Sequence, residues 1–312
     1  MHRERKLFIG RCMRLLPFAR VASMGVLMSV VSAQSAPAAD KKPIRWLLAG
    51  QGIAAIAADA EASGLLDKSR PFVRQSRKIT SVLPPSWDAV PFETFASFRT
   101  MQSVLGRGTL DPSLKAIMYD NEKWKFTPEE EQRDPARYEK LAADLVHQHG
   151  LMFLAAPAVD LIGVLEPGSR GKRYDAYLQL GIAGDAARYA DVIDIQAQSA
   201  ERDAEAYAHF VLQAAAQARR ANPKVLVLAG VSTNPNGQRV TANDILGAIT
   251  ATRDSVDGYW LNIPRPSEYC PGCTEFRPDI AVEVLRRLAY RRAQRPNFPP
   301  EAMQDCDAKT RK

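Results

Sequence analysis

The chain has 312 residues, of which 46% are hydrophobic and 25% charged, with a net charge of +7. A chain of this size forms one large barrel or two ordinary domains. Residues 1–36 hold six Lys/Arg and one Glu, so the rest of the chain has a net charge of only +2. That balance lacks the basic excess that nucleic-acid binding requires, and we expect no nucleic-acid partner.

Residues 1–36 have the features of a secretory signal peptide. Basic residues precede the apolar stretch Val21–Ser32, which is too short to span a bilayer comfortably. Small residues favour cleavage near Ala33 or Ala36. We therefore expect a secreted or periplasmic bacterial protein, monomeric and without membrane attachment after cleavage. The alternative is an uncleaved membrane anchor.

Short apolar runs alternate with longer helical patterns over residues 37–294. Most runs are continuously apolar, as parallel strands covered on both faces are. The candidate strands are Ile44–Ala49, Ile79–Leu83, Leu114–Tyr119, Leu151–Ala156, Val192–Gln196, Val225–Gly230 and Gly258–Ile263, with an eighth in Pro71–Lys78. This order predicts an α/β fold, a (β/α)8 TIM-type barrel of parallel strands, with an open doubly wound sheet as the competitor. Residues 295–312, rich in Pro and charge, predict a flexible tail.

Capping signals mark the expected helices between these strands. Asp134-Pro135 predicts a helix that stops at Gly150, because Asp caps and Pro suits the first helical position. Other predicted starts are Thr127-Pro128, Ser199 before a long Ala-rich helix, Thr241 with Asp244 as a capping box, and Arg277-Pro278.

Gly50–Ala55 matches the dinucleotide-binding pattern G-x-G-x-x-A after the first strand. The acidic residue expected about 20 positions later, at the end of the second strand, is missing. We interpret the glycines as a tight strand-to-helix turn and expect no cofactor. An enzyme with a nucleotide cofactor at Gly50–Ala55 is the alternative.

Cysteines at positions 270, 273 and 306 follow the leader segment. In an oxidising compartment they predict a disulfide, either Cys270 with Cys273 or one of the two with Cys306. A zinc site is the alternative, but a second pair of ligands at metal spacing is absent from the sequence. We therefore expect no metal.

The stretch from Tyr119 to Trp124 contains two carboxylates, Asp120 and Glu122, directly after a buried strand. Side chains alternate across a strand, so residues two apart point the same way. Barrels place their chemistry at this end of the strands. The groups just past the seven listed strands include no His and no Lys, which disfavours His-based metal hydrolases, Ser-His-Asp catalysis and Schiff-base aldolases.

The remaining groups at the strand ends suit a sugar ligand. Amides and carboxylates bond hydroxyls, and an indole covers the apolar face of a pyranose. The predicted substrate-binding residues are Tyr119, Trp124, Gln196, Gln198, Asn234, Trp260 and Asn262. Glycoside hydrolysis needs one protonated and one ionised carboxyl group, which predicts Glu122 as general acid and Asp120 as the neighbour that raises its pKa. Asp160, Asp194 or the substrate would supply the second group.

A structural interpretation stands beside this one. Asp-Asn-Glu after a strand also suits a simple turn that caps the next element, and Glu122 could pair with Lys123 or Lys125. Trp124 and Trp260 could be ordinary core residues.

Asp120-x-Glu122 resembles the end of the Asp-x-x-Asp-x-Asp-x-Glu signature of chitinase-like glycoside hydrolases. In that family the motif ends the fourth barrel strand, and a Trp from the eighth strand forms the floor of the sugar site, where Trp260 falls here. The two earlier acids correspond to Lys115 and Met118. The resemblance implies a glycosidase-like barrel acting on polysaccharide. A non-catalytic carbohydrate-binding barrel is the alternative.

Overall fold

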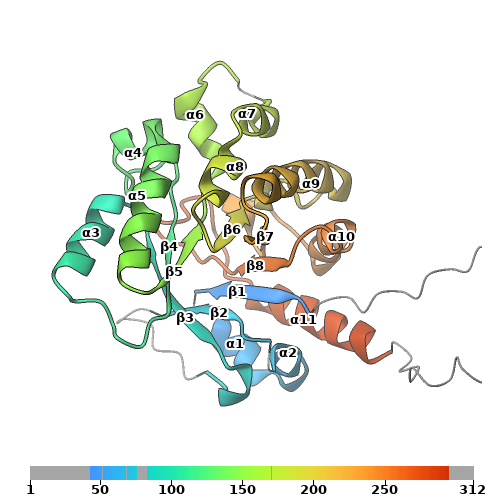
Figure 1. Cartoon of the computed structure of the whole chain (residues 1–312). Coiled ribbons are helices and arrows are strands. Elements are labelled where there is room, and N and C mark those ends of the chain that lie inside the picture. The colour runs from blue at the N-terminus through green and yellow to red at the C-terminus, as the bar shows by residue number, and fades with distance from the viewer. Residues whose placement is uncertain (1–42, 51, 68, 76–82, 170, 295–312) are drawn as a thin grey trace, which may run out of the picture. The chain divides into compact units, whose positions relative to one another are not determined.

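A computed structural model describes residues 43–294 except 51, 68, 76–82 and 170. Eight parallel strands close into a barrel in their order along the chain (Figure 1). They are β1 Arg45–Ala49, β2 Phe72–Arg74, β3 Val90–Phe95, β4 Ala116–Tyr119, β5 Met152–Ala155, β6 Val192–Ile195, β7 Leu226–Ser232 and β8 Gly258–Asn262. The (β/α)8 barrel is confirmed. The open sheet is excluded because β1 pairs with β8.

Helices surround this barrel (Figure 1). They are α1 Ile53–Ala58, α2 Ala60–Leu66, α3 Phe98–Gly106, α4 Glu129–Arg133, α5 Pro135–Gln148, α6 Ile162–Leu165, α7 Arg173–Gln179, α8 Ile182–Ala187, α9 Ala204–Ala221, α10 Ala242–Thr252 and α11 Pro278–Ala293. Short 3-10 turns are η1 Pro85–Trp87, η2 Val159–Leu161, η3 Gln198–Ala200 and η4 Pro235–Gly237.

The strand assignment differs from the sequence prediction in one place. The eighth strand does lie within Pro71–Lys78, as β2, which makes β4 the fourth strand. Of the predicted strand Ile79–Leu83, residues 79–82 lie outside the described residues, and Leu83 is not in a strand. The third strand is β3, where Pro91 argues against a central strand in the sequence. Its carbonyl still accepts a hydrogen bond from the backbone N–H of Lys115 at 2.9 Å.

Two predicted helix starts are confirmed by their hydrogen bonds. Asp134 accepts from the N–H of Arg137 at the start of α5, and Thr241 forms the capping box with Asp244 at α10. The start at Ser199 is wrong. That residue lies in η3, and α9 begins later with Asp203 as its N-cap.

The predicted helix after Thr127 exists as α4, but Thr127 does not cap it. The N-cap of α4 is Pro128, which makes no side-chain bond. The Thr127 hydroxyl instead donates to the carbonyl of Ala96 at 2.6 Å, a contact with a distant segment that local sequence does not indicate.

The core has two layers, because strand residues alternate between the lumen and the helices. The lumen cluster consists of Leu47, Ala49, Phe72, Val90, Phe92, Ala116, Met118, Leu154, Ala156, Val192, Leu228 and Trp260. Their strand neighbours, such as Ile117, Tyr119 and Ile193, pack in the layer between barrel and helices. This alternation decides which strand-end groups reach the carboxyl-terminal mouth of the barrel.

The glycines after β1 are explained by close packing. Gly50 has a φ of +93°, and a Cβ at Gly52 would lie 2.6 Å from side-chain atoms of Ile263, the residue after β8. The helix that follows, α1, has only six residues. This packing supports the tight-turn interpretation of Gly50–Ala55, in which Gln51 lies outside the described residues.

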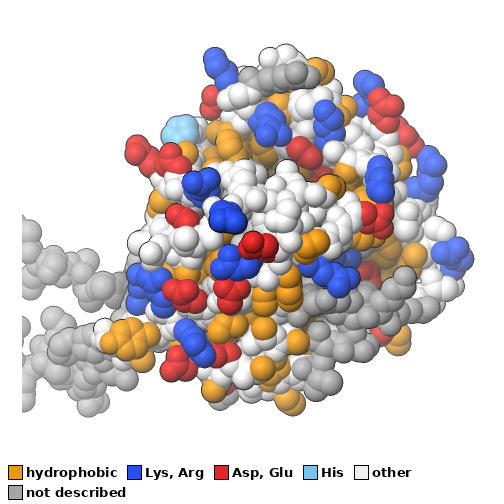
Figure 2. All heavy atoms as spheres, turned by 180° about the vertical axis from the view of Figure 1, so that it is seen from behind, with side chains coloured by type: hydrophobic (Ala, Val, Ile, Leu, Met, Phe, Trp, Pro, Cys, Tyr) orange, Lys and Arg blue, Asp and Glu red, His pale blue; other side chains and the backbone are white. Residues whose placement is uncertain are grey.

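The visible surface carries charges of both signs. Lys/Arg and Asp/Glu side chains are interspersed over the face in Figure 2 and form no single-sign stripe there. Among the described residues, no helix combines the length and apolarity needed to cross a membrane.

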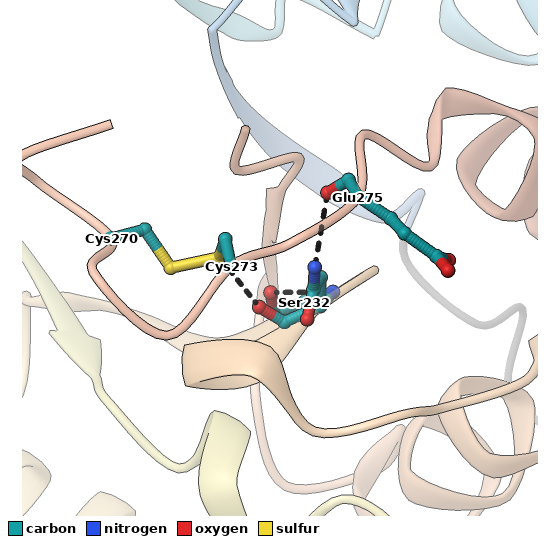
Figure 3. The surroundings of a disulfide bond; sticks show 5 residues. Ser232, Cys270, Cys273 and Glu275 are labelled. Carbon is teal, nitrogen blue, oxygen red and sulfur yellow. Dashed lines mark hydrogen bonds between the residues drawn. A yellow bond between two sulfur atoms is a disulfide. The ribbon is translucent and has the colours of Figure 1, made fainter. Parts of the chain in front are cut away.

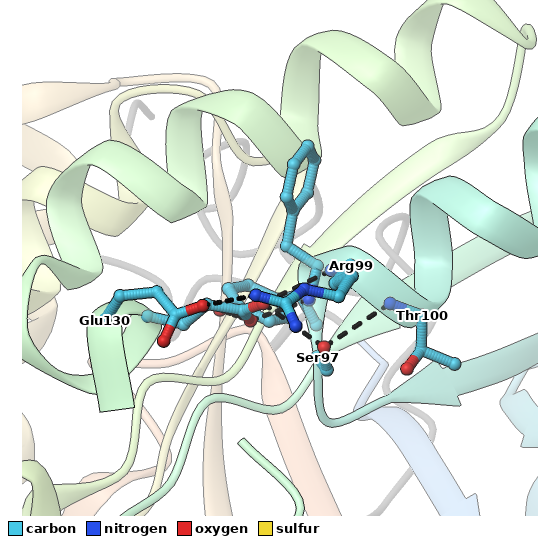
Figure 4. A network of polar contacts seen from close by, with 7 residues as sticks. Ser97, Arg99, Thr100 and Glu130 are labelled. Carbon is cyan, nitrogen blue, oxygen red and sulfur yellow. Dashed lines mark hydrogen bonds and ion pairs between the residues drawn. The ribbon is translucent and has the colours of Figure 1, made fainter. Parts of the chain in front are cut away.

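Glu131, a buried residue of α4, fastens the start of α3 to the barrel. Its carboxylate accepts hydrogen bonds from the N–H groups of Phe98 and Arg99 at 2.7 and 3.2 Å and from the Ser97 hydroxyl at 3.1 Å. The Tyr119 hydroxyl donates to it at 2.8 Å. Figure 4 shows the surroundings, in which Ser97 also caps α3 through the N–H of Thr100, and Arg99 pairs with Glu130.

We predict that Glu131→Ala lowers the free energy of unfolding by about 3 kcal/mol or more, because it leaves the buried hydroxyls of Ser97 and Tyr119 and the half-buried N–H of Phe98 without their acceptor. The exposed Glu129 of the same helix pairs with Arg133. Glu129→Ala should therefore change stability by at most about 0.5 kcal/mol. Urea denaturation of both variants measures the difference, and equal effects would contradict the assigned role of Glu131.

Candidate active site

The carboxyl groups of Asp120 and Glu122 lie together at the mouth of the barrel. Met118 faces the lumen and Tyr119 faces the helices, so strand alternation carries Asp120 back to the lumen side. The two carboxyl groups are within hydrogen-bonding reach of each other. The side-chain amide of Gln196, just after β6, donates to Asp120 Oδ1 and to the carbonyl of Ala156, both at 2.9 Å. The pair is thereby tied to three neighbouring strands.

Burial is the main influence on the ionisation of both groups. It raises the pKa of Asp120 to about 6, although hydrogen bonds from Glu122 and Gln196 and the charge of Arg74 act in the opposite direction. Burial, followed by the negative charges of Asp120 and Asp160, raises the pKa of Glu122 well above its usual range. The residue Glu122 keeps intermediate exposure while its carboxyl group is enclosed by protein atoms. The arrangement favours a protonated Glu122 that donates to an ionised Asp120.

Two more acids lie near the pair. Asp160 in η2 accepts from the N–H of Lys123 at 2.9 Å, and burial raises its pKa. Asp194 is fully buried in β6, and neither of its carboxyl oxygens has a hydrogen-bond partner among the described residues. Burial, then the charge of Asp120, raises the pKa of Asp194 well above its usual range. Both residues that the sequence named for the second group are therefore present around the pair.

Arg74, the last residue of β2, also belongs to the site and was not among the predicted residues. Phe72 of the same strand faces the lumen, so alternation directs Arg74 to the same side. Its positive charge lowers the pKa of Asp120, and its guanidinium lies 3.9 Å from the Glu93 carboxylate. A basic residue at the end of a strand would have indicated this role. The predicted range Pro71–Lys78 was too broad to show that the strand ends at Arg74.

Trp260 and Gln198 reach the interior of the barrel. Trp260 of β8 is 7% exposed within the lumen cluster, and its indole N–H has no partner among the described residues. The side-chain amide of Gln198 lies against Gly230 of β7, since a Cβ there would be 2.5 Å from Gln198 Nε2. An inward-facing indole and two amides, from Gln196 and Gln198, therefore accompany the acids.

Tyr119 does not join this group, contrary to the prediction that it binds substrate. It is fully buried between barrel and helices, where its hydroxyl bonds to Glu131. As an immediate neighbour of Asp120 on a strand it must face the opposite way.

The role of Asn234 in substrate binding stays a prediction. Its side-chain amide donates to the backbone carbonyl of Glu275 at 3.1 Å, so it fastens one loop to another. Asn262, at the end of β8, is half-buried, and its backbone carbonyl accepts from the N–H of Thr233.

Trp124 lies beside the pair, in the segment that follows β4. Its backbone N–H donates to the carbonyl of Glu122 at 3.0 Å, and its indole N–H donates to the Thr127 hydroxyl at 2.7 Å. The half-buried ring contacts Phe126 and Tyr269. Trp124 is therefore part of a group of aromatic side chains on two loops and does not lie in the barrel core.

The disulfide joins Cys270 and Cys273 in the loop between β8 and α11 (Figure 3). Of the pairings left open by the sequence, this is the one formed, and Cys306 lies outside the described residues. The sulfur of Cys273 lies 3.5 Å from the carbonyl oxygen of Asn234. In the described part of the chain, no group of three or more His, Cys, Asp or Glu is arranged to hold a metal ion.

Comparison with known proteins yields no family model that matches the sequence and no curated protein that matches it. Solved structures match it at low similarity. A β-1,3-glucanosyltransferase mutant of Rhizomucor miehei, in complex with laminaritriose, is 11% identical, with 72% of this chain and 88% of that chain covered and a TM-score of 0.41.

Two bacterial structures are similar to the same extent. A structure described as a putative α-L-fucosidase of Bacteroides thetaiotaomicron is 9% identical, with 87% and 99% of the two chains covered and a TM-score of 0.46. A spore cortex-lytic enzyme of Bacillus megaterium is 10% identical, with 80% and 75% covered and a TM-score of 0.42. At this level of similarity, we infer the function from this chain's own residues.

We predict that Glu122→Gln becomes more stable relative to the wild type as the pH rises above about 4. The folded wild type holds a proton that the unfolded chain releases near pH 4, so its free energy of unfolding falls by up to about 1.4 kcal/mol per pH unit from this site. Glutamine has no proton to lose and keeps a donor for Asp120. Urea denaturation from pH 4 to 8 measures the difference, and a constant difference across that range would contradict the raised pKa.

Proposed function

We propose that the protein is a glycoside hydrolase that acts on a polysaccharide, with Glu122 as the general acid. The observation that carries this proposal is the carboxyl pair at the barrel mouth, where burial and the neighbouring charges of Asp120 and Asp160 favour a protonated Glu122. A glycosidic oxygen is a poor leaving group unless it is protonated as the bond breaks, and a carboxylic acid with a raised pKa supplies that proton near neutral pH.

Asp120 is the positioning partner of Glu122 in this proposal. Its carboxylate accepts from the acid, and Gln196 holds it in place at 2.9 Å. When Glu122 gives up its proton, the negative charge of Asp120 favours its return, which resets the acid. The oxocarbenium-like transition state also needs a carboxylate or a substrate group on the opposite side. We propose Asp160 for this role, because its charge acts on Asp120. Asp194 is the alternative, and it would first have to release its proton, because burial raises its pKa well above the usual range.

The surrounding groups suit sugar recognition. The indole N–H of Trp260 is buried and has no protein partner among the described residues, so a sugar hydroxyl that entered the barrel mouth would satisfy it. The amide groups of Gln196 and Gln198 can donate to and accept from sugar hydroxyls. Arg74 adds a guanidinium near Asp120 that helps keep this group ionised while Glu122 is protonated.

A non-catalytic carbohydrate-binding barrel is the second candidate. The observation that favours it is the engagement of Asp160, whose Oδ1 accepts the backbone N–H of Lys123 and so stabilises a loop. If Asp160 serves only that loop and Asp194 stays buried, the pair has no opposite carboxylate, and the site binds sugar without cleaving it.

We also propose that the protein is exported after removal of residues 1–36, which lie outside the described residues. The Cys270–Cys273 disulfide supports this, because such bonds persist in oxidising compartments and are rare in the cytosol. Mass spectrometry of the protein recovered from the periplasm or medium would identify the N-terminus near residue 34 or 37.

We predict that Glu122→Gln lowers the rate of polysaccharide hydrolysis by about 10²–10⁴-fold, the usual contribution of a general acid, and leaves binding intact. Reducing-end release from a panel of α- and β-linked polysaccharides measures turnover, and calorimetry measures binding. Glu130→Gln, an exposed acid of α4, is the control and should retain full activity.

Three results distinguish the candidates. Loss of turnover with retained binding in Glu122→Gln supports the hydrolase. Binding without turnover by the wild type supports the binding barrel. A wild type that neither binds nor cleaves any glycan in the panel contradicts both.

A further inference from the structure

Three aromatic side chains form a cluster beside the candidate active site, which we call the aromatic platform: Trp124, Phe126 and Tyr269. Phe126 and Tyr269 are stacked with ring centroids 4.7 Å apart, and Trp124 meets both rings edge-on at 5.1 and 6.1 Å. Tyr269 is 62% exposed. One face of its ring is covered by Phe126, and the high exposure leaves the rest of the ring accessible to solvent.

The platform joins two loops that follow barrel strands. Trp124 and Phe126 come after β4, directly beyond the acid pair, and Tyr269 comes after β8. Next to the rings, the exposed side chains of Lys125 and Glu268 form an ion pair at 3.0 Å that links the same two loops. The platform is therefore continuous with the candidate site, because only Lys123 separates Glu122 from Trp124.

The loop that carries Tyr269 is held by contacts that do not involve the ring. The disulfide constrains Cys270 and Cys273 immediately after it, and the side chain of Asn234 donates to the carbonyl of Glu275 (Figure 3). Gly272 packs so closely that a Cβ would lie 2.5 Å from the carbonyl oxygen of Asn236. A ring held in place before a ligand arrives loses little conformational freedom on binding.

We propose that the aromatic platform is a subsite that binds a sugar unit of a long glycan beyond the units held at the acid pair. The inference rests on the proposed function. Such a subsite would make the protein bind long glycans more tightly than short ones. The open face of Tyr269 covers the apolar C–H face of a pyranose ring. The Lys125 ammonium and Glu268 carboxylate beside it supply a donor and an acceptor for the ring hydroxyls.

The chemistry favours a glycan over a protein partner. A protein interface needs a larger apolar core with aromatic anchors that become fully buried. Here only Tyr269 of the three rings is highly exposed, and the neighbouring surface is an ion pair. One accessible ring edged by charged hydrogen-bonding groups matches the size and polarity of a single sugar unit.

The test compares Tyr269→Ala with Tyr290→Ala. Tyr290 lies near the end of α11 and is 64% exposed, so the two variants remove the same side chain at equal exposure. Both are made in the Glu122→Gln background so that bound glycan is not cleaved. The probes are hexasaccharides and disaccharides of β-1,3-glucan, β-1,4-glucan, β-1,4-xylan, β-1,4-linked N-acetylglucosamine and α-1,4-glucan, with affinity measured by calorimetry.

We predict that Tyr269→Ala weakens binding of the recognised hexasaccharide by about tenfold and leaves disaccharide affinity unchanged. Tyr290→Ala should change neither affinity. Tyr269→Phe should keep the hexasaccharide affinity, because the ring face remains. Unchanged disaccharide binding also shows that the variant is folded.

An equal affinity of Tyr269→Ala and the background for the hexasaccharide would overturn the platform and leave the proposed function standing. An equal loss for hexasaccharide and disaccharide would also overturn it, since the ring would then serve the acid-pair site. Failure of the background protein to bind any probe would overturn the platform together with the proposed function.

Discussion

Closure of the sheet between β1 and β8 is the constraint on which the rest of the structure depends. The two strands pair over five residues, from Arg45 opposite Gly258 to Ala49 opposite Asn262. The backbones approach so closely that a Cβ at Gly258 would lie 1.8 Å from the carbonyl oxygen of Arg45. Once the barrel is closed, each strand residue must face either the lumen or the helices. Tyr119 faces the helices, where its hydroxyl bonds to Glu131 of α4, and its neighbour Asp120 faces the mouth of the barrel.

The barrel mouth concentrates carboxyl groups where burial makes their ionised forms unfavourable. Asp120, Glu122, Asp160 and Asp194 all have raised pKa values with burial as the leading cause. Such clustering lowers stability at neutral pH and is characteristic of sites where protonation states matter for function. Glu131 shows the opposite solution, because its carboxylate is satisfied by four donors and serves the fold.

The loops that follow the strands are braced by side chains from other loops. Asn234 bonds the segment at Glu275, and the aromatic platform joins the loops after β4 and β8. The disulfide shortens the free part of the last loop. Bracing of this kind allows irregular backbone to hold functional side chains in defined positions on a rigid barrel.

The sequence by itself determined the barrel class, the caps at Asp134 and Thr241, and the carboxyl pair, because these follow from local periodicity, capping chemistry and residue spacing. It missed β3, whose Pro91 is tolerated through pairing with distant strands, and it placed the buried Tyr119 with the substrate. The sequence indicated Gln196 and Asp160 as strand-end groups, but only the tertiary structure added Arg74 and showed which of these groups act on Asp120. Arg74, Gln196 and Asp160 come from three different strand ends, and only closure of the barrel brings side chains so distant in sequence into one buried cluster.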